Sequence, residues 1–274
     1  MMADACYLAC TEYFNVDKNE WEKIGDACPT VFISVELDKE ELQTMALAFI
    51  SGVPENHIIR GEMSFEEIDR VQRAVAIINS SELYIEYFPD YSLKDIENCI
   101  KRNLRVHKAT YIFLDYITSS MKIIEEVSKA AHGTKAREDQ ILFLLSSRLK
   151  DIATTYHVFI FSATQINGLA KDAKILDQNM LAGAKSIANR IDLGAIMVDC
   201  TPEDLNDIEG LLSDNPGIGV PNVKMSIYKN RRGEHNRVVL WMRADKSTCR
   251  YKTLFVTDYA GILVTNILKQ KKGE

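Results

Sequence analysis

The stretch Thr110-Tyr-Ile-Phe-Leu-Asp115-Tyr116 indicates the fold class of this chain of 274 residues. Its apolar run is rich in β-branched and aromatic residues, which is typical of a strand buried on both faces of a parallel sheet. The run ends on a single carboxylate, Asp115, and open α/β sheets bind their ligands at the carboxyl ends of their strands. An acid in this position can hold the Mg²⁺ of a bound triphosphate, although in many proteins it only caps the following turn.

Two more predicted strands end on polar side chains. Residues 31–35 run into Glu36, and residues 157–164 run into Gln165. Because parallel strands present their carboxyl ends at one edge, the sequence predicts a glutamate, an aspartate and a glutamine there. A general base for water, a metal-binding carboxylate and an amide that senses a phosphate form a coherent set. Each residue alone is equally well explained as an ordinary strand end, but the three together favour a catalytic site.

Composition bounds the class of protein. A chain of 274 residues that is 46% hydrophobic can bury one substantial core, so a single domain over residues 1–274 is expected. A net charge of −6 argues against a generally basic nucleic-acid binder and restricts such contacts to local basic loops. The six cysteines have no zinc-site spacing, which favours free thiols in a reducing compartment. Neither a membrane-spanning run nor a signal peptide is visible, so the sequence predicts a soluble, cytoplasmic chain.

The pattern of apolar residues predicts an α/β fold, with a mostly parallel sheet flanked by helices and a C-terminal antiparallel extension. Capping boxes at Asp38 and Ser64 predict that two helices begin there. A helix is also expected over residues 2–14, followed by a polar connection over residues 15–30. The extension is expected to follow an acidic insert at residues 200–221 and to contain strands over residues 223–228, 238–243 and 252–256.

Four short motifs in order resemble the motor domain of DnaB-type replicative helicases, a family of RecA-like hexameric ring helicases with phage members. The motifs are Ser34-Val-Glu36, Leu114-Asp115-Tyr116, Ser162-Ala-Thr-Gln165-Ile-Asn167 and Lys229-Asn-Arg231-Arg-Gly233, and the resemblance covers roughly residues 1–265. It implies a RecA-like core in which Glu36 polarises the attacking water and Asp115 serves the metal. It also implies that Gln165 couples the γ-phosphate to DNA-binding loops.

The same resemblance assigns roles to two basic segments. It implies that Lys229 and Arg231 project into the site of a neighbouring subunit, and the planar donors of arginine suit the charge on phosphoryl oxygens. The other explanation of this turn is a solvated basic hairpin. The segment containing Gly183, Lys185 and Ser186 resembles the family loop that contacts single-stranded DNA, since small residues admit phosphates to the backbone. That segment departs from the usual charge pattern of the family loop, and a helix start packed against the sheet explains it equally well.

One motif that a triphosphate motor needs does not occur in the sequence. G-x-x-x-x-G-K-[ST] would supply the amides and the lysine that cradle the phosphates. Residues 1–10 resemble the family helix that directly follows this loop, so we expect the sequence to start just after it, without the first strand. ATP and Mg²⁺ remain the cofactors implied by the resemblance. We expect weak or no hydrolysis by the chain alone, and a sheet edge left open by the missing strand.

The function that these observations favour is an ATP-dependent DNA helicase motor domain acting in DNA replication. Its expected partners are single-stranded DNA and further copies of the chain in a ring, hexameric in the family. One alternative is another RecA-like ATPase on the same core. A second alternative is a non-catalytic DNA-binding or ring-associated subunit, in which Lys229 and Arg231 act on a neighbour although the chain's own site is inactive.

Overall fold

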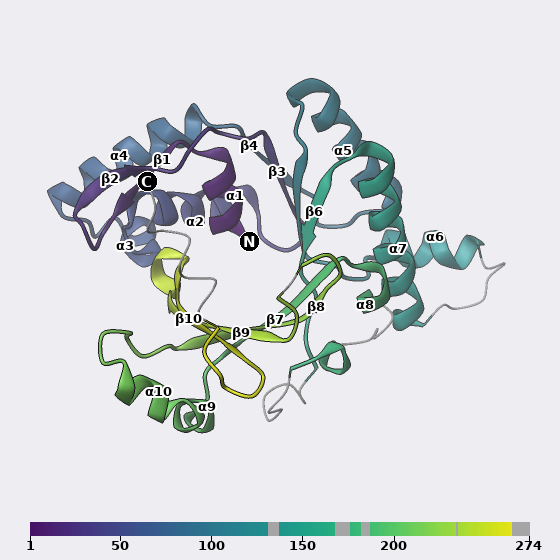
Figure 1. Ribbon diagram of the computed structural model, residues 1–274. Coiled ribbons are helices and arrows are strands. Elements are labelled where there is room, and N and C mark those ends of the chain that lie inside the picture. The colour runs from purple at the N-terminus through teal and green to yellow at the C-terminus, as the bar shows by residue number, and fades with distance from the viewer. Residues whose placement is uncertain (131–136, 168–175, 182–186, 234, 265–274) are drawn as a thin grey trace. The chain divides into compact units, whose positions relative to one another are not determined.

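The computed structural model describes residues 1–130, 137–167, 176–181, 187–233 and 235–264 (Figure 1). Its contacts divide the chain into two compact units. The first unit comprises Met1–Thr164 together with Ser247–Arg250, and the second comprises Gln165–Lys246 together with Tyr251–Glu274. Within the described ranges, no helix is long and apolar enough to cross a membrane.

The first unit contains the predicted parallel sheet. Its strands are β3 (Thr30–Ser34), β4 (Leu83–Tyr87), β5 (Tyr111–Asp115) and β6 (Phe159–Ser162), in the order β4-β3-β5-β6 and all parallel. Every residue of β3 is buried, which agrees with a central strand covered on both faces. At the other end of the order, β6 is an edge strand, and the side chains of Phe159 and Phe161 on it are 56% and 37% exposed.

Helices flank this sheet, and their starts follow from local capping. They are α1 (Met2–Ala9), α2 (Lys39–Ser51), α3 (Glu55–Arg60), α4 (Phe65–Asn79), α5 (Leu93–His107), α6 (Met121–Ala130) and α7 (Glu138–Tyr156). The predicted capping boxes at Asp38 and Ser64 are both present, since each side chain accepts a hydrogen bond from the backbone of the third helical residue. The core stacks Phe32 of β3 on Phe113 of β5, at 6.2 Å between ring centroids, and α1 and α2 contribute to the same cluster.

The helix expected over residues 2–14 is wrong in its second half. α1 ends at Ala9, and Cys10 is extended. Two short strands follow, β1 (Glu12–Asn15) and β2 (Glu20–Lys23), which pair as an antiparallel hairpin where a polar connection was expected. Phe14 and Trp21 meet edge to face across the hairpin, with 5.5 Å between ring centroids. This cross-strand aromatic pair stabilises the hairpin over a continued helix.

A short segment from late in the chain completes the first unit. Nε of Arg250 donates to the carbonyl oxygen of Phe49 at 3.0 Å, and its guanidinium lies 5.4 Å from the centre of the Tyr13 ring. Phe49 lies in the last turn of α2, which is followed by Gly52 in the left-handed conformation with φ 65°. The cation therefore satisfies carbonyl groups that every helix leaves open at its C-terminus.

The second unit contains the predicted antiparallel extension. Its strands are β7 (Leu193–Asp199), β8 (Val223–Asn230), β9 (Val238–Asp245) and β10 (Arg250–Asp258), in the order β10-β9-β8-β7, and β8 pairs antiparallel with both β7 and β9. Its described helices are short: η2 (Gln178–Met180), α8 (Ile187–Arg190), α9 (Pro202–Asp207) and α10 (Glu209–Asp214); η3 (Lys246–Thr248) bridges the division between the units. The acidic insert thus folds into α9 and α10, and a capping box at Thr201 with Pro202 in the first turn explains where α9 begins.

Candidate nucleotide site

Glu36 and Asp115 lie at the carboxyl ends of adjacent parallel strands. Ser34, the last residue of β3, pairs in register with Asp115, the last residue of β5, and Val35 N donates to the Asp115 carbonyl oxygen at 3.0 Å. The buried hydroxyl of Ser34 then shapes the turn that carries Glu36. It donates to the Leu37 carbonyl oxygen at 2.7 Å and accepts from Leu37 N at 3.0 Å. The strand register thus brings the backbone of both acids to one edge of the sheet.

The electrostatics of Asp115 reflect this position. Burial is the main cause that raises the pKa of its carboxyl above the ordinary value of 3.8. The amino group of Met1 acts in the opposite direction, and the nearby charge of Glu36 raises the pKa again. Two carboxylates that share a half-buried edge disfavour each other's charge, and a bound cation would relieve that repulsion.

The edge that carries Glu36 and Asp115 suits a metal ion that takes few of its ligands from the protein. The Asp115 carboxylate makes no hydrogen bond or ion pair within the described ranges, and those ranges contain no cluster of three or more potential ligands from His, Cys, Asp and Glu. Mg²⁺ is commonly held by one or two carboxylates while phosphates and waters complete its shell. Asp115 has the chemistry for that role, and Glu36 is the second carboxylate beside it. Neither residue offers a donor to phosphate oxygens.

The start of α1 offers backbone donors, but an acid already lies beside them. Met1 is the N-cap, and its side chain provides no cap for the backbone N–H groups of the first turn of α1. Asp4 in the first turn pairs with the amino group of Met1 at 3.2 Å. A carboxylate at this position complements the helix dipole, as a phosphate would.

The other predicted residues are not tested by this geometry. Gln165 follows β6, which pairs in parallel with β5, but it is the first residue of the second unit, and the two units are described separately. Gly183, Lys185 and Ser186 lie outside the described residues. The assignment of these four residues stays a prediction.

Lys229 and Arg231 are held by residues of their own unit. Nζ of Lys229 donates to the Ala188 carbonyl oxygen, and burial, followed by the charge of Arg231, lowers the pKa of the ammonium. Asp192 counteracts part of this lowering of the Lys229 pKa. The guanidinium of Arg231 pairs with Asp192 at 3.2 Å and also donates to the Asn189 carbonyl oxygen at 3.3 Å. A ligand that binds Lys229 or Arg231 must therefore displace these partners within the unit.

A β-bulge determines the face of the sheet on which Lys229 lies. Gly194 pairs with Lys229 and Ala195 pairs with Ile227, so Tyr228 is the extra residue on β8. Without the bulge, the alternation of side chains would place Lys229 on the opposite face. Gly194 makes the bulge possible, because a Cβ on it would lie 2.4 Å from Cζ of Tyr228. This packing fixes the side to which the basic turn is directed.

The roles of three supporting residues were missed from the sequence. Ser34 had a local signal, because a hydroxyl directly after an apolar strand and before an acid is typical of a side-chain-stabilised turn. Asp192 had none, since it pairs with a residue 39 positions away. Gly194 was visible as a glycine inside an apolar strand, which is a common sign of a bulge or of a close approach.

Comparisons with known proteins identify the family of this chain. The family model described as "DnaB-like helicase C terminal domain" matches residues 13–252. A protein of Bacillus subtilis (strain 168), the SPbeta prophage-derived uncharacterized protein YorI, is 34% identical over 269 residues, which are 97% of this chain and 53% of that protein. A probable plasmid replicative DNA helicase of Chlamydia muridarum is 23% identical over 247 residues, 90% of this chain and 48% of the relative. The chain thus spans about half the length of these curated relatives.

Solved structures show the same fold. A structure described as an ATPase domain matches with a TM-score of 0.64 and 14% identity, over 83% of this chain and 75% of that chain. A DnaB-like replicative helicase, solved in a study of its interactions with primase, matches with a TM-score of 0.63 and 14% identity, over 82% of this chain and 50% of that chain. At this level of identity the likeness concerns the fold, which is that of RecA-like ATPase domains.

Proposed function

The chain belongs to the DnaB-like helicase C-terminal domain family, and we propose that it is the motor part of an ATP-dependent DNA helicase that acts in replication. The observation that carries this proposal is the pair of acids at the ends of β3 and β5, in register through Ser34 and Asp115. Glu36 lies two residues after Ser34, so a base and a metal-binding carboxylate share one edge of the sheet. The family membership and the RecA-like fold support the same assignment.

The two acids have different tasks in the proposed reaction. Asp115, half-buried and without a cationic side chain paired to it in the described ranges, is the residue that would hold Mg²⁺. A bound magnesium ion would neutralise charge on the β- and γ-phosphates of ATP. Glu36 is exposed beyond the end of its strand and accepts a proton from the attacking water. The Ser34 turn holds the backbone of Glu36 so that its carboxylate stays at this edge.

Lys229 and Arg231 are proposed to act on the nucleotide of a neighbouring subunit in a ring. Arg231 presents planar donors suited to the equatorial oxygens of the transferring phosphoryl group. Its pair with Asp192 is about half exposed on both sides, with side-chain exposures of 48% and 53%, so giving it up costs little. Contact with single-stranded DNA through Gly183, Lys185 and Ser186, and coupling through Gln165, are parts of the same proposal.

The chain alone is expected to be a weak ATPase. Its 274 residues contain no G-x-x-x-x-G-K-[ST], and Glu36 and Asp115 offer no donors to phosphates. Positioning supplies most of the catalysis in phosphoryl transfer, so acids without a phosphate cradle have little to act upon. The second candidate function follows from this point. A subunit whose own site is weak can still place Arg231 in a partner's site.

ATP hydrolysis by the purified chain, with and without an intact DnaB-like helicase, tests the proposal. We expect little hydrolysis by the chain alone, and a changed ATPase rate of the helicase when the two are mixed. Any hydrolysis by the chain itself should fall about 10²- to 10⁴-fold in Glu36→Gln, because a general base is lost. Glu40→Gln, an exposed acid on α2, is the matched control and should leave the rate unchanged.

The arms of this experiment separate the candidates. Loss of the effect on the helicase in Arg231→Ala, but not in Glu36→Gln, supports a subunit that acts only on its neighbour. Hydrolysis by the chain that survives Glu36→Gln unchanged would overturn the assignment of the base. Strong hydrolysis that Glu36→Gln abolishes would keep the assignment and contradict the expected weakness of the isolated chain.

A further inference from the structure

The acidic insert of the second unit carries an apolar surface that the proposed ATPase chemistry does not use. Its buried centre consists of Ile208, Trp241 and Phe255. Apolar side chains that are only partly buried pack around this centre, and two more exposed ones, Val220 and Ile262, lie close to them in the sequence. We define the insert surface as the outer part of this group: Leu211, Leu212, Ile218, Val220, Leu254, Ile262 and Leu263.

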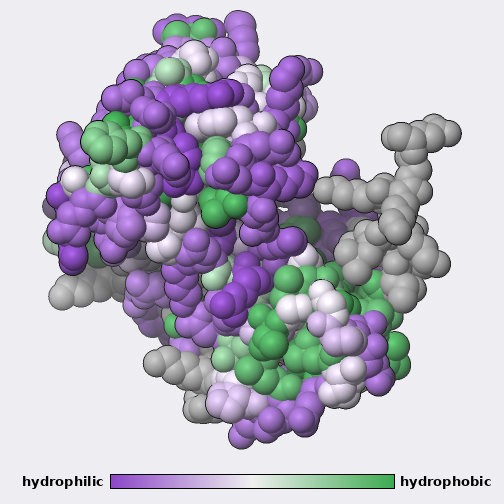
Figure 2. Space-filling view, turned by 90° about the vertical axis from the view of Figure 1, so that its left-hand side faces the viewer, coloured by the Kyte–Doolittle hydropathy of each residue, from purple (hydrophilic) through white to green (hydrophobic). Residues whose placement is uncertain are grey.

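The insert surface is open to solvent. Ile262 is 66% exposed and Val220 is 54% exposed. Figure 2 shows a continuous apolar area on this unit at the lower right, with hydrophilic residues below it. A contiguous apolar area with a polar border is the usual mark of a protein interaction site, whereas single exposed apolar residues need no explanation.

Backbone groups beside the insert surface already have hydrogen-bond partners, so a binding partner would contact the side chains of this surface. Ile218 N donates to the Asn215 carbonyl oxygen at 3.0 Å, in the turn after α10. The segment after β10 folds back on that strand, because Thr257 pairs with Leu263 and Val264 N donates to the Val256 carbonyl oxygen at 2.8 Å. This return occupies the C-terminal end of β10, so an added strand finds no open backbone beside Ile262 and Leu263. A helix that inserts apolar side chains is therefore the form of partner that fits.

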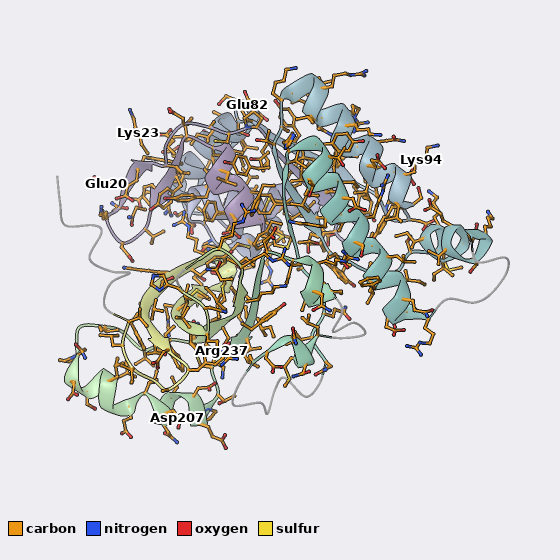
Figure 3. All side chains as sticks on the ribbon, turned by 45° about the vertical axis from the view of Figure 1, so that its right-hand side comes forward. Glu20, Lys23, Glu82, Lys94, Asp207 and Arg237 are labelled. Atoms are coloured by element: carbon orange, nitrogen blue, oxygen red, sulfur yellow. The ribbon has the colours of Figure 1, made fainter. Side chains whose placement is uncertain are left out.

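The charge of the insert itself has one sign. Residues 200–222 contain five acids and no lysine or arginine; the acids are Glu203, Asp204, Asp207, Glu209 and Asp214. One of them is neutralised internally, since Asp204 pairs with Lys224 of β8 at 2.5 Å. Glu203, Glu209 and Asp214 are exposed and make no ion pair within the described ranges, and Figure 3 shows Asp207 at the outer side of α9. The insert thus gives the surface a mainly negative border, and one cation lies beside it, since Nη1 of Arg243 donates to the Val220 carbonyl oxygen at 3.5 Å.

We propose that the insert surface docks a positively charged amphipathic helix of a partner protein. Such a helix supplies an apolar stripe for Ile262 and Val220 and flanking lysines or arginines for the acids. The same acids repel DNA phosphates and anionic lipid headgroups. A second copy of this chain would bring two negative borders together, so it fits less well than a basic partner.

Binding of helical probe peptides to the full chain tests the proposal. The probe is a labelled peptide with leucines on one face and lysines on the other, and the comparison peptide replaces every lysine by glutamate. We expect saturable binding of the lysine peptide, measured by fluorescence anisotropy, and none of the glutamate peptide. The affinity should fall as salt is raised, because the acids contribute to attraction.

Variants locate the binding site on the chain. Val220→Ser combined with Ile262→Ser should weaken binding at least about tenfold, which corresponds to about 1.4 kcal/mol. Ile59→Ser in the first unit is the matched control, since Ile59 is 69% exposed, and it should have no effect. Glu209→Gln combined with Asp214→Asn should weaken binding less and flatten its salt dependence. Thermal unfolding by circular dichroism checks that each variant is folded.

Three outcomes would overturn the proposal. The first is equal binding of the lysine and glutamate peptides, or no saturable binding of the lysine peptide. The second is equal loss of binding in Ile59→Ser and in the Val220→Ser, Ile262→Ser variant, both folded. The third is self-association of the chain, seen by sedimentation, that the Val220→Ser, Ile262→Ser variant abolishes, because a second copy would then be the occupant.

Discussion

The parallel sheet of the first unit and the antiparallel sheet of the second unit hold their candidate catalytic side chains differently. In the first unit, β3 is buried along its whole length, and regular register with β5 places the acids at one edge. In the second unit, a bulge at Tyr228 directs Lys229, and a carbonyl group holds the cation. A regular sheet thus fixes Glu36 and Asp115, whereas a local irregularity fixes the basic turn.

This difference predicts where the pair of acids and the basic turn are each vulnerable to substitution. The acids depend on the packing of a large core, so damage to that core should affect stability before it affects geometry. The basic turn depends on one close contact, so small changes beside it should redirect Lys229 at a modest cost in stability.

The largest effect is expected from Phe32→Ala. Phe32 is fully buried and stacks on Phe113, so truncation should cost about 3–5 kcal/mol of unfolding free energy. Denaturant unfolding followed by fluorescence can resolve the two units, because Trp21 lies in the first and Trp241 in the second. Versions that keep only one tryptophan should show a large shift through Trp21 and a smaller one through Trp241. Equal shifts would show that the two units unfold together, which would contradict the separate dependence of each sheet on its own packing.

Gly194→Ala should come next. The added Cβ would lie 2.4 Å from Cζ of Tyr228, and overpacking of this kind costs about 1–3 kcal/mol. We expect a lower unfolding midpoint through Trp241 and a weakened effect of the chain on a partner helicase, since the bulge before Lys229 shifts. Gly217→Ala is the control, because a Cβ there meets nothing within 4 Å. A Gly194→Ala chain as stable as the Gly217→Ala chain would refute the packing argument.

Asp115→Asn should stabilise the first unit at neutral pH. The pKa of Asp115 is raised in the folded chain, so the folded state holds its proton more tightly than the unfolded state. Stability of the wild type should therefore fall, relative to Asp115→Asn, as pH rises from about 3.8. Unfolding midpoints measured between acid and neutral pH check this prediction. Glu36→Gln should stabilise the first unit in the same direction, but by less than Asp115→Asn. Parallel pH profiles for wild type and Asp115→Asn would contradict it.

The smallest effect is expected at the ion pair of Arg231 with Asp192. Both side chains are about half exposed, at 48% and 53%, so Asp192→Asn should cost roughly 0.2–1 kcal/mol of stability. Salt should diminish the difference between variant and wild type. The unfolding midpoint followed by Trp241 fluorescence should move little. A shift as large as that of Gly194→Ala would show that the ion pair contributes much more to the stability of the second unit than expected.

Local patterns were sufficient to predict the strands that lead to Glu36 and Asp115. The apolar run before Asp115 and the capping boxes at Asp38 and Ser64 each lie within a few residues of the feature they specify. The antiparallel extension was predicted in the same way, from three apolar segments separated by turns. Its strands extend further than predicted, since β8 continues to Asn230 and β10 runs over Arg250–Asp258.

Long-range packing explains what the sequence did not reveal. Cys6, Cys10 and Phe14 have helical spacing, yet Phe14 packs on Trp21 and on Arg70 of α4, which stabilises a strand instead. The bulge at Tyr228 depends on which residues of β7 and β8 pair, and that register is set by the whole sheet. Asp192 reaches Arg231 across 39 positions, and no local pattern encodes such a partner.

The contact of Arg250 with α2 has a consequence for the order in which the chain can fold. Arg250 and Phe49 are separated by 201 positions, and most of the second unit lies between them in the sequence. During synthesis, α2 therefore leaves the ribosome long before the cation that caps its C-terminal carbonyls. The first unit should remain unfinished until residues 165–246 have been made, and closing so long a loop is slow. A nascent chain stopped before Ser247 would thus expose the end of α2 to proteases, and one extended past Arg250 would protect it.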